Sequence, residues 1–444
     1  MSQSRVLYVC HNHPGIRSGG AELYTLDLYE AMRASGKFMP LLLARMGRPH
    51  TSTTRYHPGT HFAAVNSDPN QYFLHTDLEE FDSFRGSLRN KSVVTGDLRV
   101  FLEAHRPDVV HFQHTIYIGY DAVRVVRNAL PNVPIIYTLH EYWPICHRGG
   151  QLLRAWTDEP CLEESPRRCN ECFPEISPQD FFMRKRFIQS QFQLVDLFVA
   201  PSRFLRDRYV HWGLPRDRIL VEENGHLRGA KSYGAAVEGK PNRLGFFGQL
   251  SHPKGILVLL EAMKLLGADT DAHLIIHGEN LELQPEQFQE RFGALLQAAG
   301  DRVTFAGRYE RADLPALMNA TDWVIVPSIW WENSPLVIQE AFLHGRPVIC
   351  SDIGAMAEKV TDGVNGLHFK ANDPNSLRGV ITRAVEDRSL WSELQGGIPE
   401  VHGMDNHVRR LTHAYEGLIE SKARGASHPP AGQTTKQVVG ASDA

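Results

Sequence analysis

Two glutamates, Glu332 and Glu340, lie on either side of the start of a predicted helix in the stretch ENSPLVIQEAFLHGRPVICSD. Ser334 is a favourable N-cap and Pro335 suits the first helical position, while Gly345 ends the helix before a strand. The free N–H groups at a helix start favour an anion such as phosphate. The two acids and the helix start together indicate a site for a ligand that carries phosphate.

A helical wheel over residues 336–344 places Glu340 among Leu336, Val337 and Leu343. We therefore expect Glu340 to be buried. An unpartnered buried carboxylate is unfavourable, so Glu340 requires hydrogen-bond donors, which the hydroxyl groups of a ligand could supply.

Two glycine-containing turns are further candidates for ligand contact. Gly19 and Gly20 follow the strand RVLYVCHN, where they would let the backbone approach a ligand closely. Gly248 follows a strand of the second half, and Lys254 stands at a helix start, where a lysine can hold phosphate. A Gly-Gly turn means little alone and most lysines are simply exposed, but the nearby acids favour a site at Lys254.

Two of the 22 histidines, His114 and His140, end predicted strands of the first half, in DVVHFQHT and IIYTLHEYW. Either could handle a proton or bind a polar group there. His111 lies within its strand and is expected to be packed. The residues alone do not rank His114 above His140.

Four of the six cysteines fall in one polar, charged stretch with the spacing C-x14-C-x7-C-x2-C. They are Cys146, Cys161, Cys169 and Cys172. Four thiolates fit a structural zinc ion, and the C-x2-C pair is the stronger half of that signal. Disulfides are not expected in a cytosolic protein, so unliganded thiols are the alternative. Cys10 and Cys350 lie in strands and are expected in the core.

Short apolar strands alternate with helix-length segments, which implies right-handed βαβ units and parallel sheets. The predicted strands are RVLYVCHN, MPLLLA, DVVHFQH, PIIYTLH, LFVAPS and ILVEENG in the first half, and RLGFFGQ, HLIIHGE, VTFAGR, WVIVPS, PVICSD and GLHF in the second. We predict an α/β protein with two Rossmann-like domains facing each other across a cleft, and ligands beyond the carboxyl ends of the strands.

The predicted domains follow from these halves. They are residues 1–227 with a cysteine-rich insertion at about 146–172, a linker 228–242, a second domain 243–404, a helix 405–421 that packs back toward the first domain, and a disordered tail 422–444.

The composition excludes several classes of protein. With 47 basic and 51 acidic residues the formal charge is −4, which argues against nucleic-acid binding. No apolar run reaches about 18 residues and the N-terminus lacks a secretory signal, so we expect a cytoplasmic protein. The stretch SPQDFFMRKRFIQSQFQLVDLF is expected to form a helix with a basic face in solvent and an opposite face packed on the protein. The alternative is a helix that holds the protein weakly at the inner face of a membrane.

Seven stretches resemble the retaining glycosyltransferases of family 4, which have the GT-B fold. They are SGGAELYTLDL, TLHEYW, VDLFVAPSRFL, FFGQLSHPKGI, ATDWVIVPS, the E-x7-E of Glu332 and Glu340, and GRPVICSDIGAMAEKVTDGVNGLHF. The resemblance implies transfer of a sugar from a nucleoside-diphosphate sugar, held mainly by the C-terminal domain, to an acceptor on the N-terminal domain. The acceptor would be a polysaccharide, a glycolipid or other lipid-linked sugar, or a small-molecule glycoside. No metal or other cofactor is expected in the chemistry.

The resemblance also implies roles for single residues. Glu332 would contact the donor sugar, Glu340 the ribose hydroxyls, and Lys254 the diphosphate, while Gly20 lies on a loop that closes over it. The backbone that would hold the diphosphate is that of Asn333, Ser334, Pro335, Leu336 and Val337.

Two positions depart from the family pattern. Gln249 stands where the family often has an arginine, so Arg308 or Arg17 is expected to supply that charge. The usual H-x-H becomes HFQH, which makes His114 the first choice for the catalytic histidine and leaves His140 as the alternative.

Other functions on the same fold remain as alternatives. A nucleotide-sugar epimerase should lack the E-x7-E arrangement, and a phosphorylase should carry a pyridoxal-binding lysine, which nothing here marks. A nucleotide-sugar-binding protein or a redox sensor that uses the cysteines is the non-enzymatic alternative.

Overall fold

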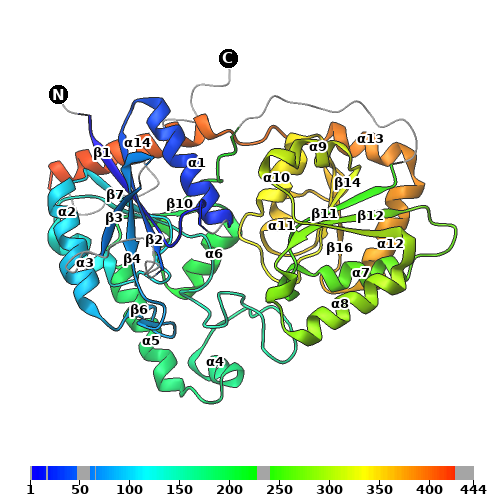
Figure 1. Ribbon diagram of the computed structural model, residues 1–444, viewed down its shortest axis with the longest axis horizontal. Coiled ribbons are helices and arrows are strands. Elements are labelled where there is room, and N and C mark those ends of the chain that lie inside the picture. Colours follow the sequence, from blue (N-terminus) through cyan, green and yellow to red (C-terminus); the bar gives the residue numbers. More distant parts are fainter. Residues whose placement is uncertain (1–2, 17–18, 48–60, 66, 228–240, 426–444) are drawn as a thin grey trace. The chain divides into compact units, whose positions relative to one another are not determined.

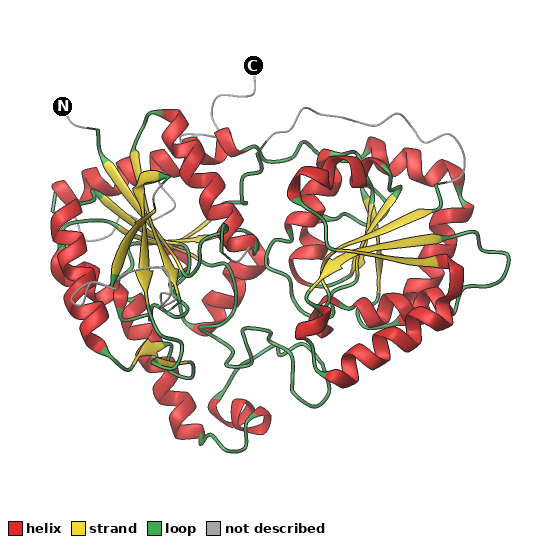
Figure 2. Cartoon of the chain, in the orientation of Figure 1, coloured by secondary structure: helices red, strands yellow, loops and turns green. Residues whose placement is uncertain are grey.

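The computed structural model describes residues 3–16, 19–47, 61–65, 67–227 and 241–425. The chain divides into two units. Unit 1 comprises residues 1–150, 161–227 and 402–444, and unit 2 comprises residues 151–160 and 228–401. Each unit contains a mainly parallel sheet with helices on both of its faces (Figure 2).

The main sheet of unit 1 has eight strands in the order β10-β9-β8-β7-β1-β2-β4-β3. All neighbours are parallel except β3 and β4. The strands are β1 (Arg5–Cys10), β2 (Met39–Met46), β3 (Phe62–Val65), β4 (Asp68–His75), β7 (Val109–Phe112), β8 (Ile135–Thr138), β9 (Leu197–Ala200) and β10 (Ile219–Val221), with a separate hairpin of β5 (Phe81–Asp82) and β6 (Ser87–Leu88). The six predicted strands are all present, and β3 to β6 were not predicted.

The main helices of unit 1 are α1 (Gly20–Ser35), α2 (Arg99–His105), α3 (Ala122–Ala129), α4 (Pro166–Cys172), α5 (Pro178–Phe192), α6 (Arg203–Trp212) and α14 (Met404–Ala423), and a π-helical turn η1 (Val93–Leu98) precedes α2 (Figure 1). Helix α14 belongs to the same hydrophobic core as β1 and α1, through Leu411 and Tyr415. The Tyr415 hydroxyl lies 2.6 Å from Nδ1 of His111, a residue that is fully buried in β7 as expected. The last helix of the described residues therefore completes the core of unit 1.

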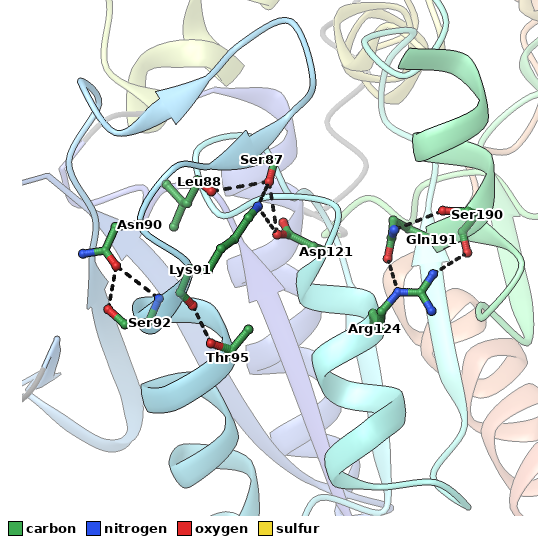
Figure 3. Close-up of polar contacts among 10 residues, drawn as sticks. All are labelled: Ser87, Leu88, Asn90, Lys91, Ser92, Thr95, Asp121, Arg124, Ser190 and Gln191. Carbon is green, nitrogen blue, oxygen red and sulfur yellow. Dashed lines mark hydrogen bonds and ion pairs between the residues drawn. The ribbon is translucent and has the colours of Figure 1, made fainter. Parts of the chain in front are cut away.

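Polar contacts hold α3 against its neighbours (Figure 3). Lys91 Nζ lies 2.5 Å from the Asp121 carboxylate just before α3, and it also contacts Ser87 in β6. On the same helix Arg124 donates to Gln191 Oε1 at 3.1 Å and to the Ser190 carbonyl at 3.2 Å. These bonds fix α5 to the body of unit 1.

The sheet of unit 2 has six parallel strands in the order β13-β12-β11-β14-β15-β16. The strands are β11 (Arg243–Gln249), β12 (His273–Glu279), β13 (Val303–Gly307), β14 (Trp323–Val326), β15 (Val348–Ser351) and β16 (Gly366–Phe369). The helices are α7 (Ile256–Lys264), α8 (Glu286–Ala299), α9 (Leu314–Asn319), α10 (Leu336–Leu343), α11 (Gly354–Lys359), α12 (Pro374–Glu386) and α13 (Arg388–Gly396). All six strands predicted for the second half are present, and Cys10 and Cys350 are buried in strands as expected.

The burial of α5 differs from the prediction of a basic face in solvent and an opposite face packed on the protein. Arg184, expected on the solvated face, is buried, whereas Phe182 and Met183 are 52% and 62% exposed. The guanidinium can be buried because its N–H groups bond to three main-chain carbonyls, those of Phe84, Trp143 and Pro144. No helix of the described residues is long and apolar enough to cross a membrane. Most of the predicted linker and tail lie outside the described residues.

Gly255 precedes α7 with φ 71° in the left-handed region, and a Cβ there would lie 1.8 Å from the Pro327 carbonyl oxygen. Gly255→Ala should lower the free energy of unfolding by at least about 1–3 kcal/mol from the backbone conformation alone. Gly293→Ala in α8 is the control, since nothing lies within 4 Å of its Cβ and alanine favours a helix by about 1 kcal/mol. Urea unfolding measures both variants, and a Gly255→Ala protein as stable as wild type would contradict the packing described.

Candidate functional site

The first feature of unit 2 is a buried ion pair at the carboxyl ends of neighbouring strands. Glu332 follows β14, and Lys254 ends a turn of 3-10 helix, η3 (His252–Lys254), that follows β11. Glu332 is 5% exposed, and its Oε1 accepts from Lys254 Nζ at 2.7 Å, Ser328 Oγ at 2.7 Å and Trp330 Nε1 at 2.9 Å. Burial alone would raise the pKa of Glu332, but Lys254 and the two hydrogen bonds outweigh burial and lower it. Glu332 is therefore held as a carboxylate.

The two turns that carry this pair contact each other through their backbones. The Ile329 N–H donates to the Pro253 carbonyl at 2.9 Å, and Gly255 packs against the Pro327 carbonyl. Strands β11 and β14 are direct neighbours, so the turns leave the sheet side by side. The sheet therefore fixes the distance between Lys254 and Glu332.

The start of α10 differs from the sequence prediction. The helix begins at Leu336 with Pro335 as its N-cap, and Ser334 does not cap it with its side chain. Among the described residues the Ser334 hydroxyl has no hydrogen-bond partner although it is buried. The N-cap prediction is wrong because the chain stays extended through Pro335, and it leaves a hydroxyl group available beside a helix start.

Glu340 is only half-buried, which corrects the expected burial. The face of α10 that packs into the core carries Ile338, Ala341 and Phe342. The helical wheel could not distinguish the two faces because α10 is apolar on nearly every side. Glu340 lies close enough to Tyr309 that its charge, after the larger effect of burial, contributes to raising the pKa of that hydroxyl.

The remaining donor-site candidates line the same edge of the sheet. Gly248 and Gln249 end β11, and Gln249 pairs in register with Glu279 of β12. Arg308 is exposed, and its guanidinium lies 3.5 Å from the Glu279 carboxylate. Arg17 lies outside the described residues.

Unit 1 gathers a second set of ionisable residues beyond its strands. Nε2 of His11, after β1, lies 3.1 Å from Oε1 of Glu22 in the first turn of α1. The rings of His11 and His114 are 4.1 Å apart, and His114 Nε2 lies 3.5 Å from Oε1 of Glu141. His114 Nδ1 accepts the Ile116 N–H at 3.1 Å, so a neutral His114 carries its proton on Nε2.

Gly19 and Gly20 start the helix that carries Glu22. Gly20 is the first residue of α1 and Gly19 its N-cap. A Cβ on Gly19 would lie 2.6 Å from the Glu22 carboxylate, so the glycine leaves room for that side chain.

These unit 1 groups hold their protons differently. Burial lowers the pKa of His114 well below its usual value and that of His140 to about 3, and the charge of His11 lowers both further. Burial alone would also lower the pKa of His11, but contacts with the Cys10 thiol and the Glu22 carboxylate raise it to about 9. Burial raises the pKa of Glu141 to about 8, against the Trp143 N–H that bonds its carboxylate. His11 is thus charged at neutral pH, whereas His114 and His140 are neutral.

Sequence reasoning missed His11, Glu22 and Glu141. His11 and Glu141 follow strands just as His114 and His140 do, so the strand-end rule applied to every polar residue would have found them. Glu22 had no such signal, because its contact with His11 depends on how α1 folds back against β1.

Two family models match the chain. The model described as "Glycosyltransferase Family 4" matches residues 18–226, and "Glycosyl transferases group 1" matches residues 234–395. The chain is 23% identical over 398 residues to the glycogen synthase of Mycobacterium tuberculosis strain H37Rv, which covers 86% of each protein. It is 28% identical over 285 residues to the lipopolysaccharide 1,2-N-acetylglucosaminetransferase of Salmonella typhimurium, covering 63% of this chain and 64% of that one.

Solved structures share the fold. HepE of Anabaena, crystallised with UDP and glucose, superposes with a TM-score of 0.62 at 18% identity, covering 94% of this chain and 100% of that one. The sucrose-phosphate synthase of Thermosynechococcus elongatus gives 0.66 at 16% identity, with 94% and 100% covered. The predicted GT-B fold is confirmed.

Glu141 should make stability fall as pH rises. Its carboxyl group ionises near pH 4.5 in the unfolded chain and at about 8 in the folded protein, so the folded state holds an extra proton between these values. One such proton changes the free energy of unfolding by at most about 1.4 kcal/mol per pH unit. Glu141→Gln should therefore gain stability relative to wild type between about pH 6 and about pH 8.

Urea unfolding at the two pH values measures this difference, with the exposed Glu80→Gln as the control. Parallel pH profiles for Glu141→Gln and wild type would show that Glu141 is already ionised at neutral pH.

Proposed function

The chain belongs to glycosyltransferase family 4, and on that premise we propose that it transfers a sugar, with retention of configuration, from a nucleoside-diphosphate sugar bound by unit 2 to an acceptor held by unit 1. The observation that carries the proposal is the Lys254–Glu332 pair beside the unpartnered Ser334 hydroxyl at the start of α10. A cation, a hydroxyl and free helix N–H groups form a set of donors for a diphosphate.

In the proposed reaction the bond between the anomeric carbon and the diphosphate oxygen breaks while the acceptor oxygen bonds to the same face of the sugar. The leaving phosphate oxygen takes the acceptor's proton, so no separate base is needed. Negative charge grows on the diphosphate as it departs, and Lys254 together with the backbone of residues 333–337 stabilises it. Glu332 faces the donor sugar, and its ion pair with Lys254 orients both groups before the donor binds.

Glu340 is proposed to accept hydrogen bonds from the ribose hydroxyls. Its half-buried position suits this role, since a side chain that is not enclosed in the core can be reached by a ligand. The ribose contact therefore does not depend on the burial that the sequence suggested.

On the acceptor side, His114 is the proposed hydrogen-bond partner of the reacting groups. The Ile116 N–H occupies Nδ1, so Nε2–H is the atom that donates. His140, whose Nε2 lies 3.0 Å from Gln113 Oε1, remains the alternative. The burial of both rings keeps them neutral, which suits hydrogen bonding better than proton transfer.

Similar proteins suggest the first substrates to test. HepE was crystallised with UDP and with UDP-glucose, and the relatives named above are called synthases or transferases of carbohydrates. A panel of UDP-, GDP- and ADP-sugars, scored by release of the nucleoside diphosphate, tests transfer directly. Tight binding without release by any acceptor would favour a nucleotide-sugar-binding protein instead.

The two acids should separate binding from turnover. Glu340→Gln should weaken binding of the bare nucleoside diphosphate about ten- to hundredfold, the loss of about 1.5–3 kcal/mol typical of a hydrogen bond to a charged group. Glu332→Gln should spare that binding but lower turnover, because its partner is the sugar. Calorimetry and initial rates measure the two effects, with the exposed Glu393→Gln of α13 as the control. Wild-type behaviour of both variants would refute the site.

Lys254→Ala should lower kcat about 10²–10³-fold, the loss typical when one donor to a developing anion is removed. It also leaves buried Glu332 with only two donors, so stability should fall as well. The double variant Lys254→Ala/Glu332→Gln is expected to regain stability but not kcat. A double variant whose kcat equals that of Glu332→Gln alone would mean that Lys254 serves only to neutralise Glu332.

A further inference from the structure

The four cysteines of the polar stretch all belong to unit 1, on the two sides of a short excursion of the chain. The chain leaves unit 1 after Gly150 and returns at Cys161, while residues 151–160 group with unit 2. Cys146 lies just before this departure, in a turn where its N–H donates to the Tyr142 carbonyl at 2.8 Å. Cys169 and Cys172 lie three residues apart on α4. Both ends of the excursion and the following helix therefore each supply thiols.

The four side chains are of intermediate burial and form no disulfide. The segments that carry them lie together, since the ring of His147, next to Cys146, is 4.9 Å from the ring of Phe173, next to Cys172. Cysteines outside disulfides usually occupy apolar cores, whereas these four stand among polar and charged residues in the sequence.

Arg184 gives the second, independent observation. Its guanidinium is 4% exposed, bonds only to main-chain carbonyls, and forms no ion pair with any described residue. The side chain interacts with Cys146 and Cys169, and two of its bonds go to the carbonyls just before Cys146. Glu141 also acts on Arg184, but its pKa of about 8 leaves it largely neutral at pH 7. A buried cation without a counter-charge is costly, so this position calls for an anion.

A second cluster of possible metal ligands, in the described part of the chain, needs no ion. Among the described residues, the only three potential ligand atoms within 4.8 Å of one another belong to Glu222, His402 and His407. There the Glu222 carboxylate already accepts from both histidines, at 2.9 and 3.1 Å, and from Arg410 at 2.7 Å. That network is satisfied without an ion. The four thiols are not gathered so tightly, so an ion would have to draw them together.

We propose that Cys146, Cys161, Cys169 and Cys172 bind one zinc ion, which closes the base of the excursion against α4 and supplies the counter-charge of Arg184. Binding would release the four thiol protons to solvent and change no oxidation state, leaving a Zn–S4 centre with a net charge of about −2. A closed four-sulfur site has no open position, so its role is structural. The segment between the ligands is already anchored, since Lys185 Nζ lies 2.5 Å from Glu164 and Arg208 donates to the Leu162 carbonyl at 2.7 Å.

The first test is metal analysis of the full-length protein, purified without a histidine tag or chelator. We expect about one zinc per chain. Modification with an organomercurial should release that zinc in step with the four thiols, and Co2+ in its place should give the charge-transfer absorption of cobalt thiolates. These readings use the wild-type chain, so they hold even if a cysteine variant fails to fold.

Variants then identify the ligands. Cys169→Ser and Cys172→Ser should each lose the zinc, while Cys350→Ala, which removes a buried thiol of unit 2, should keep it. Arg184→Gln should raise the zinc dissociation constant, and Arg186→Gln on the exposed face of α5 should not. Protein without metal whose four thiols are freely titratable, or are paired as disulfides, would overturn the proposal, as would zinc retained in Cys169→Ser.

Discussion

Burying a carboxylate is the constraint around which unit 2 is arranged. Glu332 can remain charged at 5% exposure only because an ammonium, a hydroxyl and an indole N–H converge on one of its oxygens. The convergence requires two turns from neighbouring strands to lie in backbone contact, and it requires a glycine where they meet. In the proposed function the same carboxylate faces the donor sugar, which ties the stability of this region to its proposed chemistry.

Unit 1 handles burial in the opposite way. Beyond the ends of its strands, only His11 and Glu22 form an ion pair in this group of residues. Burial keeps the other three, His114, His140 and Glu141, neutral. A donor-binding surface needs charge to hold a diphosphate, whereas a surface for a sugar hydroxyl needs neutral groups that give and take hydrogen bonds. The contrast between the two strand edges fits the division of labour proposed for the two units.

Features of the fold and the site could be predicted from the sequence where neighbouring residues determine them, and not where they depend on residues far away in the chain. Short apolar runs identified twelve parallel strands, because most of these strands are buried and apolar on both faces, although β13 is mostly exposed. Strand β4 begins Asp-Pro-Asn and was missed, since these residues usually mark turns. The motifs placed Glu332 and Lys254 at the ends of their strands. The predicted capping by Ser334 was wrong because the chain stays extended through Pro335. The predicted burial of Glu340 was wrong because an apolar helix does not reveal which face it packs. The burial of Arg184 depends on carbonyl groups far away in the sequence, such as that of Phe84, and no local pattern reports them.

The place of α14 has a consequence for how the chain is made. Its residues Leu411 and Tyr415 complete a core that also contains β1, so this core cannot be finished until residues beyond unit 2 have been synthesised. Unit 2 contains all of its own sheet, whereas unit 1 without α14 would leave part of its core uncovered. We therefore expect a chain that stops before residue 402 to aggregate through the apolar surface of unit 1 that α14 covers.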